Sequence, residues 1–198
     1  MLDKLTVKDA DVAGKRVLVR VDFNVPLTEG TVTDDTRVRA ALPTLRYLVD
    51  RGARVIIVSH LGRPKGQRDE QYSLRPVRRV LNRLLGRNVH FVDDIVGKDA
   101  QEAVDRMVDG EIVMLQNVRF DPGEKANDPE FARQLAGLAD VYVNDAFGAA
   151  HRAHASTTGV AEYIPAYAGM LLAREVEMLT DMLANPDKPF VAILGGSK

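Results

Sequence analysis

Residues 16–26, RVLVRVDFNVP, place a short apolar run directly before a group of polar residues. Five further runs follow along the chain: RVIIVS at 54–59, VHFV at 89–92, IVMLQ at 112–116, VYVN at 141–144 and FVAIL at 190–194. All are short, rich in β-branched residues and almost continuously apolar, which is typical of strands covered on both faces of a sheet. The sequence therefore predicts six buried strands.

Amphipathic segments with helical periodicity separate these runs. They cover residues 36–50, 74–85, 98–108, 129–138 and 167–184. Strands that alternate with helices predict βαβ units with right-handed crossovers and a mainly parallel sheet. We therefore expect an α/β fold with three layers, α/β/α, around a Rossmann-like sheet. Pro43 lies inside the first helical segment and predicts a kink or a restart there, since proline lacks the N–H of a helical hydrogen bond.

The composition is that of a globular protein, with 45% hydrophobic and 28% charged residues among 198. The absence of cysteine from the sequence excludes disulfides and thiolate chemistry. The first residues contain no apolar signal core, and no run approaches the roughly 18 apolar residues of a membrane span. We therefore expect a cytoplasmic protein without membrane contact.

Positive charge is concentrated in the first half of the chain. Residues 1–90 hold 18 Lys and Arg against 10 Asp and Glu, and 14 of those cations are arginines. The guanidinium fork suits phosphates and carboxylates, so an anionic partner is one interpretation. A solvated arginine-rich surface is the other. A pI near 6.4 and 6% aromatic residues argue against nucleic acid as the partner.

Polar motifs follow the predicted strands at 16–21, 54–59, 112–116 and 141–144. Because the carboxyl ends of parallel strands meet at one edge of a sheet, we expect these motifs to converge. Taken singly, the first motif also fits an Asx turn and each arginine fits a surface cation. The candidate ligands are Asp22, Asn24, Arg37, His60, Arg63, Arg119 and Arg152.

Clustered guanidinium groups repel one another, so a set of four is favoured mainly where it receives a multiply charged anion. The pattern therefore predicts a site for a small phosphorylated carboxylate. The GxGxxG and Walker-type phosphate motifs are absent from the sequence. His151 and His154 have a spacing that two metal ligands could use, but they lack an acidic or thiol partner nearby in the sequence, so no metal site is expected.

Several long motifs together resemble the phosphoglycerate kinase family. They occur in that family's order from about residue 4 to 198: VRVDFNVP, DDTRVRAALPTL, VSHLGRPKG, LQNVRF, VNDAFGAAHRAHAST and AILGGSK. The resemblance implies the glycolytic reaction ATP + 3-phosphoglycerate ⇌ ADP + 1,3-bisphosphoglycerate. It also implies a phosphoglycerate-binding N-terminal domain at 1–168 and an interdomain helix and hinge at 169–186. Residues 187–198 would be the first strand of a truncated nucleotide-binding domain.

The resemblance also implies roles for the substrate-binding residues. Asp22 and Asn24 would hydrogen-bond the hydroxyl of 3-phosphoglycerate and nearby oxygens. Arg37 would lie nearest the reacting carboxylate and act catalytically, by steadying charge on the phosphoryl group in flight. The basic residues around the substrate phosphate would be His60, Arg63, Arg119 and Arg152.

Nucleotide binding is implied mainly for the half of the family's chain that has no counterpart here. Lys198 matches a lysine that contacts nucleotide phosphates. Magnesium would enter only as Mg-ATP or Mg-ADP held by that other half, so no metal is expected in this chain. We expect the 198 residues to bind 3-phosphoglycerate or 1,3-bisphosphoglycerate without turnover, and the parent enzyme to be a monomer. The alternative is a free-standing anion-binding module that was never catalytic.

Two protonation states of His60 are consistent with the sequence. A nearby phosphate favours imidazolium, so ligand binding is expected to raise the pKa of His60. The alternative is a neutral ring that is hydrogen-bonded at the end of its strand.

Overall fold

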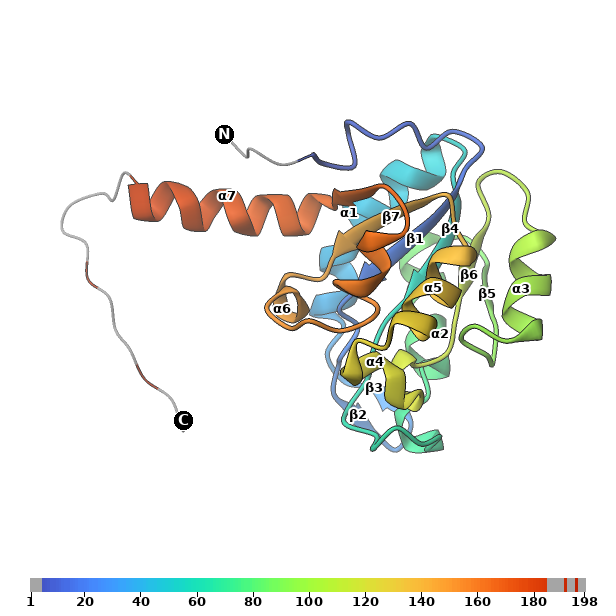
Figure 1. The fold of residues 1–198 in the computed structure, drawn as a ribbon. Helices are drawn as coiled ribbons and strands as arrows, with labels where there is room; N and C mark the ends of the chain where they lie inside the picture. Colours follow the sequence, from blue (N-terminus) through green and yellow to red (C-terminus); the bar gives the residue numbers. More distant parts are fainter. Residues whose placement is uncertain (1–4, 185–190, 192–194, 196–198) are drawn as a thin grey trace.

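The computed structural model describes residues 5–184 together with residues 191 and 195. Its centre is a six-stranded sheet in which every neighbouring pair is parallel, with helices on both faces (Figure 1). The predicted three-layer α/β/α fold is confirmed. The order across the sheet is β5 (Val89–Phe91), β6 (Ile112–Met114), β4 (Arg54–Val58), β1 (Arg16–Val21), β7 (Val141–Asp145) and β8 (Ala166–Ala168).

Strand β1 lies in the interior of the sheet, between β4 and β7. Val17 is in register with Val55 on one side and with Val141 on the other. Residues 17–21 are all buried. An apolar strand suits this position because helices cover both of its faces and neighbouring strands satisfy its backbone groups.

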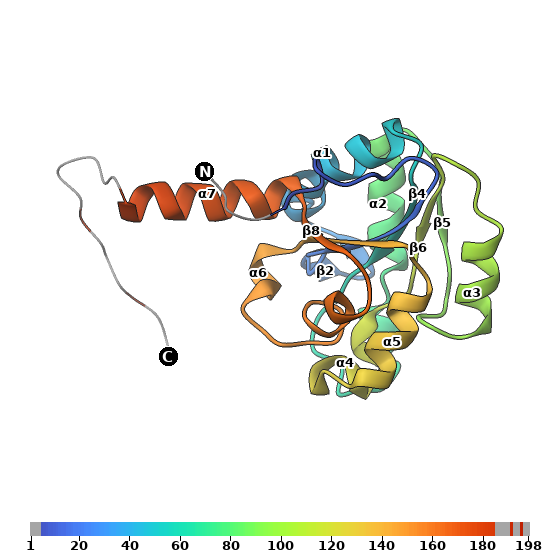
Figure 2. The same cartoon turned by 45° about the horizontal axis from the view of Figure 1, so that its top comes forward.

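Alternate residues of β1 feed two separate cores. Val17 and Val19 pack in one cluster with the apolar face of α1 (Thr36–Asp50), which includes Leu45. Leu18 belongs to a second cluster on the opposite face of the sheet, with Leu135 of α5 (Pro129–Gly137). Figure 2 shows α1 and α2 (Arg75–Leu85) on one side of the sheet and α5 on the other. Helix α3 (Lys98–Asp105) joins the second layer through Ala100 and Val104.

Smaller elements complete the fold. A two-stranded hairpin, β2 (Leu27–Thr28) and β3 (Thr31–Val32), follows β1. The short helices are α4 (Pro122–Ala126) and α6 (Phe147–Ala150), and single 3₁₀ turns occupy Glu70–Tyr72, Val118–Phe120 and Gly159–Glu162. Asp128 caps α5, since its Oδ1 accepts from the Phe131 N–H at 2.9 Å.

Helix α1 runs unbroken from Thr36 to Asp50, so the restart expected at Pro43 is wrong. Pro43 is exposed. The carbonyl four residues earlier, which proline leaves without an amide partner, can therefore be hydrated on the solvent side of the helix. Tertiary packing of the opposite, buried face holds the two halves of the helix together.

The predicted helix at 167–184 begins later than expected. Residues 166–168 instead form the edge strand β8, which pairs with β7, and α7 spans Met170–Ala184. The Gly169 N–H donates to the Asn144 carbonyl at 2.7 Å, which keeps the chain against the sheet up to the start of the helix. Helical periodicity could not reveal this long-range pairing.

The other boundaries differ less from prediction. Strand β6 ends at Met114 rather than at residue 116, and α3 ends at Asp105 rather than at residue 108. The predicted strand at 190–194 lies outside the described residues except for Val191. The predicted domain boundaries stay predictions.

Helix α7 extends away from the rest of the fold (Figures 1 and 2). Its outer half exposes apolar side chains, with Met178 59% and Leu183 75% accessible. None of the helices in the described part of the chain combines the length and the apolar character of a membrane span.

Candidate functional site

A cleft of about 400 Å³ lies at the carboxyl ends of β1, β4, β6 and β7. The chain leaves β1 toward the layer of α1, whereas the segment after β7 contributes Ala155 and Val160 to the opposite core. Loops that diverge in this way leave a crevice between neighbouring parallel strands. The cleft is lined by Asp22, Asn24, Arg37, His60, Gly62, Arg63, Arg119, Gly148, Ala149 and Arg152.

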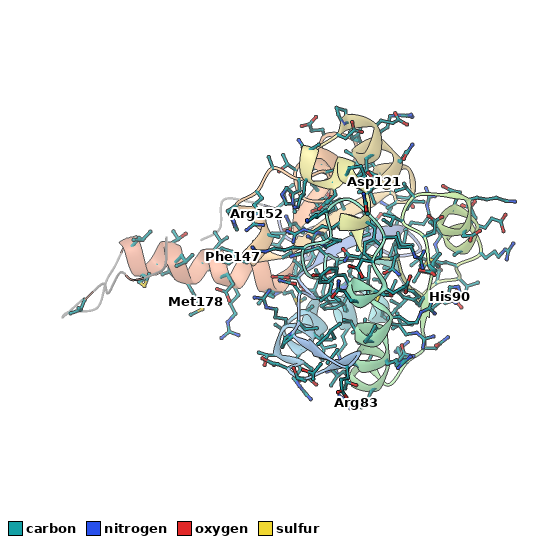
Figure 3. All side chains as sticks on the ribbon, turned by 90° about the horizontal axis from the view of Figure 1, so that it is seen from below. Arg83, His90, Asp121, Phe147, Arg152 and Met178 are labelled. Carbon is teal, nitrogen blue, oxygen red and sulfur yellow. The ribbon has the colours of Figure 1, made fainter. Side chains whose placement is uncertain are left out.

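The seven residues predicted as substrate ligands all line this one cleft. Their roles as ligands stay predictions. Arg152 and Phe147 come from the segment after β7 and lie on the side of the fold from which α7 extends (Figure 3). Lys198, the predicted nucleotide contact, lies outside the described residues.

The loop after β1 presents its polar side chains to the cleft while Phe23 between them is fully buried. Asp22 Oδ1 accepts from the Asn24 N–H at 3.2 Å, which forms the Asx turn that the sequence also allowed. Asn24 Oδ1 accepts from the Gly62 N–H at 2.8 Å, so the Asn24 amide keeps its NH₂ group as a donor. Arg37 Nη1 donates to Asp22 Oδ2 at 2.6 Å.

The loops after β4 and β6 are fastened together by a buried asparagine. Asn117 Nδ2 donates to the Leu61 and Tyr72 carbonyls at 2.8 and 2.9 Å, and its Oδ1 accepts from the Arg119 N–H at 3.0 Å. Gly62 has a φ of 62°, and a Cβ there would lie 2.2 Å from the Tyr72 ring. Glycine is therefore required where the loop passes this ring.

Arg119 is the most deeply placed of the predicted arginines in the cleft. It is only 5% exposed, and its Nη1 donates to the Gly62 carbonyl at 2.7 Å. Burial lowers the pKa of the Arg119 guanidinium, and the nearby charges of Arg20 and Arg152 lower it further. Among the residues that the structure describes, its Nε is buried without a hydrogen-bond partner. Such an underpaired cation would be stabilised by a bound anion.

His60 lines the same cleft but is neutral. Burial, together with the positive charges of Arg20 and Arg119, lowers the pKa of the imidazole to about 2. The expectation that a bound phosphate raises this pKa stays a prediction. Any such rise would begin from the neutral imidazole that this structure contains.

Arg20, which the sequence motifs did not single out, lies next to His60 at the base of the cleft. The side chain is fully buried although it belongs to strand β1. It donates from Nε to Ser156 Oγ at 2.8 Å and from Nη1 to the Val21 carbonyl, and its Nη2 lies 2.9 Å from His60 Nδ1. A usable signal was present, because a charged residue within an apolar interior strand must be buried with partners.

Glu124, which the sequence motifs also did not single out, supplies a buried negative charge close to Arg20. Its side chain is fully buried, and it accepts from the Ser156 N–H at 2.9 Å and from the Ser156 hydroxyl at 2.7 Å. The hydroxyl of Ser156 thus connects Glu124 with Arg20. Nothing in the local motif around Glu124 indicated this, since the contact spans 32 residues.

A larger hollow of about 830 Å³ lies against β5, β6 and α3. Its charged lining mixes acids such as Asp99 and Glu102 with bases such as Arg87 and Arg106. This lining does not select one sign of charge, in contrast to the cleft above β1. Within residues 5–184, no group of three or more histidine, aspartate or glutamate side chains is arranged to hold a metal ion.

The sequence is similar to curated phosphoglycerate kinases. It is 64% identical over 195 residues to the enzyme of Moorella thermoacetica and 58% identical over 195 residues to that of Pelotomaculum thermopropionicum. Each alignment covers 98% of this chain and 50% of the relative. The chain thus spans about half the length of the curated relatives it matches.

Solved structures give the same result. The phosphoglycerate kinase structure from Coxiella burnetii matches with a TM-score of 0.87 and 43% identity, covering 98% of this chain and 49% of that one. The structure from Pyrococcus horikoshii matches with a TM-score of 0.86 and 34% identity, over 93% and 47% of the two chains. The phosphoglycerate kinase family model matches residues 7–198. Together with the arginine-lined cleft, these matches show that the chain belongs to the phosphoglycerate kinase family.

Proposed function

We propose that this chain provides the 3-phosphoglycerate-binding part of a phosphoglycerate kinase. The observation that carries the proposal is the cleft above β1, which gathers four arginines and His60 around about 400 Å³. A phosphate group at neutral pH and a carboxylate together carry about three negative charges. Among the described residues that line the cleft, Asp22 is the only carboxylate, and it is already paired with Arg37. A trianionic ligand of this size would balance the remaining cations.

The arrangement suits the two ends of such a ligand differently. Arg119 is rigidly held and buried, whereas Arg37 has a side chain that is 52% exposed. We assign the phosphate to the buried side, with Arg63 and Arg152 completing its shell. Asp22 and Asn24 would hydrogen-bond the hydroxyl. Arg37 would exchange part of its contact with Asp22 for the reacting carboxylate and steady the charge in flight.

Phosphoryl transfer to a carboxylate depends mainly on alignment and charge stabilisation. The cleft supplies cationic donors and one paired carboxylate, which does not fit the oxygen ligands that magnesium needs. We propose that Mg-ATP or Mg-ADP is bound by the half of the relatives' chain that this sequence does not match. A cytoplasmic monomer is proposed from the family's role in glycolysis.

The 198-residue chain is expected to bind 3-phosphoglycerate and to show no ATP-dependent turnover. Isothermal titration calorimetry measures the first, and a coupled kinase assay measures the second. Affinity should fall as salt rises, because screening weakens attraction between partly exposed charges. Glycerate without the phosphate is the control ligand and should bind more weakly. Equal affinity for both ligands would contradict the phosphate assignment.

The alternative function, a non-catalytic anion-binding module, is tested by adding the half of a relative's chain that this sequence does not match. If the chain then still binds 3-phosphoglycerate without turnover, the non-catalytic module is favoured.

Arg63→Ala and Arg119→Ala are each expected to weaken 3-phosphoglycerate binding by about 1.5–3 kcal/mol, as for a lost hydrogen bond to a charged group. Arg79 is the matched control, because it is exposed on α2 and does not line the cleft. Arg79→Ala should leave the affinity unchanged. Calorimetry on the three variants decides the point, and an undiminished affinity in either cleft variant would remove that arginine from the phosphate site.

A further inference from the structure

The contact between Arg20 and His60 fixes the protonation of the imidazole. Arg20 Nη2 lies 2.9 Å from His60 Nδ1, and both side chains are buried. A guanidinium group has only N–H donors, so Nδ1 must accept this hydrogen bond. The ring is then neutral, and its single proton resides on Nε2.

Arg20 is itself held in place by bonds of fixed direction. Glu124 Oε1 can only accept from the Ser156 hydroxyl, so that hydroxyl must accept from Arg20 Nε. The Val21 carbonyl accepts a hydrogen bond from Arg20 Nη1. The remaining edge of the guanidinium is thereby directed at His60. The direction of donation therefore runs without ambiguity from Arg20 to both Ser156 and His60, with Glu124 as the final acceptor.

We propose that Arg20, held by Ser156 and Glu124, is a positioning residue that keeps His60 as the neutral Nε2–H tautomer, so that the ring offers one fixed N–H donor to the anion in the cleft. The identity of that anion as 3-phosphoglycerate rests on the proposed function. The assignment of the His60 tautomer does not rest on the proposed function, because it follows from contacts within the chain itself.

The surroundings of His60 favour this neutral donor over an imidazolium. His60 lines the cleft, and within residues 5–184 its Nε2 has no hydrogen-bond partner, which leaves that N–H for a ligand. An imidazolium would place a proton on Nδ1 against a guanidinium. The cations that act on the ring come from β1, from the 3₁₀ turn after β6 and from the segment after β7. The charged and titratable groups that act on the ring are Arg20, Arg119, Arg152 and His154, while the carboxylates of Asp22 and Glu124 act on the neighbouring Arg119.

The functional consequence is a histidine that does not act as a pH switch. An ordinary histidine changes its charge between about pH 5 and 8. His60 held by Arg20 would keep the same donor across that range. Any pH dependence of ligand binding there would then come from the ligand phosphate or from other groups in the cleft, and not from this ring.

Nuclear magnetic resonance of the chain labelled with ¹⁵N-histidine tests the proposal directly. The His60 ring signals are assigned by their loss in His60→Gln. We expect a protonated Nε2 and an unprotonated Nδ1 from pH 8 to 5.5, both without ligand and with saturating 3-phosphoglycerate. An Nδ1–H tautomer, or an imidazolium in either state, would overturn the proposal.

Two variants test whether the contact with Arg20 keeps His60 as the Nε2–H tautomer. Arg20→Lys keeps a positive charge but lacks the fork that reaches Ser156 and His60 together. Ser156→Ala removes the hydroxyl between Arg20 and Glu124 and leaves the two charges in place. In both, we expect a mixture of tautomers at His60, and about tenfold weaker 3-phosphoglycerate binding. Arg79→Ala is the control and should change neither signal nor affinity.

Circular dichroism shows whether each variant is folded. If Arg20→Lys does not fold, the tautomer of His60 in Ser156→Ala and in the parent chain still tests the proposal. A folded variant whose His60 stays entirely as Nε2–H would show that Arg20 does not position the ring, and the proposal would fail. Absence of 3-phosphoglycerate binding in a parent chain with the expected tautomer would instead contradict the proposed function alone.

Discussion

Glu124→Gln is expected to lower the free energy of unfolding by about 3–5 kcal/mol, as when one partner of a buried charge pair is removed. Glu124 is fully buried and accepts two hydrogen bonds from Ser156. Through that hydroxyl it compensates Arg20, which is also fully buried. Glutamine has nearly the same shape, so the change removes the negative charge without opening a cavity. The Arg20 charge is then left without its counter-charge in the protein interior.

Urea unfolding followed by circular dichroism measures this change. Glu130 provides a matched control, since it is an exposed glutamate at the start of α5 that pairs with Arg133 on the surface. Glu130→Gln should shift the unfolding midpoint little, because exposed ion pairs contribute little to stability. Similar midpoints for the two variants would mean that the protein interior compensates Arg20 in some other way.

Gly169→Ala is expected to destabilise the region where α7 joins the sheet, by about 3 kcal/mol, the sum of overpacking and a lost helix cap. A Cβ at residue 169 would lie 2.1 Å from Asp145 Oδ1 and 2.6 Å from Asp145 Cβ. Asp145 is fully buried at the end of β7 and cannot move aside as an exposed side chain could. Its Oδ1 accepts from the Leu171 and Leu172 N–H groups at 2.9 and 3.3 Å, in the first turn of α7.

Hydrogen exchange of the α7 amides, together with urea unfolding, measures the effect of Gly169→Ala. We expect faster exchange in α7 and a lower unfolding midpoint. Gly137→Ala is the control, because Gly137 is an exposed helical glycine with nothing within 4 Å of its missing Cβ. That substitution should be neutral or slightly stabilising, since alanine favours helix. Unchanged exchange in α7 of Gly169→Ala would show that Asp145 can relocate.

The fold class was predictable because it depends on local patterns that repeat. Short runs such as 16–21 and 54–58 are apolar at most positions on both faces, and strands between two helical layers bury such runs. Helix α5 was predictable at its start, because Asp128 and Pro129 specify a cap within a few residues. These are short-range effects, and the sequence contains all the atoms involved.

The members of the cleft were predictable for a related reason. Asp22, His60 and Arg119 follow strands, and a parallel sheet brings the carboxyl ends of its strands to one edge whatever the detailed packing. Their pairing was not predictable. The partners of Arg37 and Arg119 are Asp22 and the Gly62 carbonyl. Each pairing depends on loop paths that the strand pattern does not specify.

The sequence by itself therefore determined the parallel α/β sheet and the edge at which the basic residues gather. Only the tertiary structure decided which partners Arg20 has, that Glu124 is its counter-charge and that residues 166–168 form a strand before α7. Arg20 and Ser156 are 136 positions apart, and β8 pairs with β7 across a long connection. A buried charge is stable only with specific polar partners, and an edge strand only with a neighbouring strand. Local sequence does not name those partners, because the folded chain brings them together.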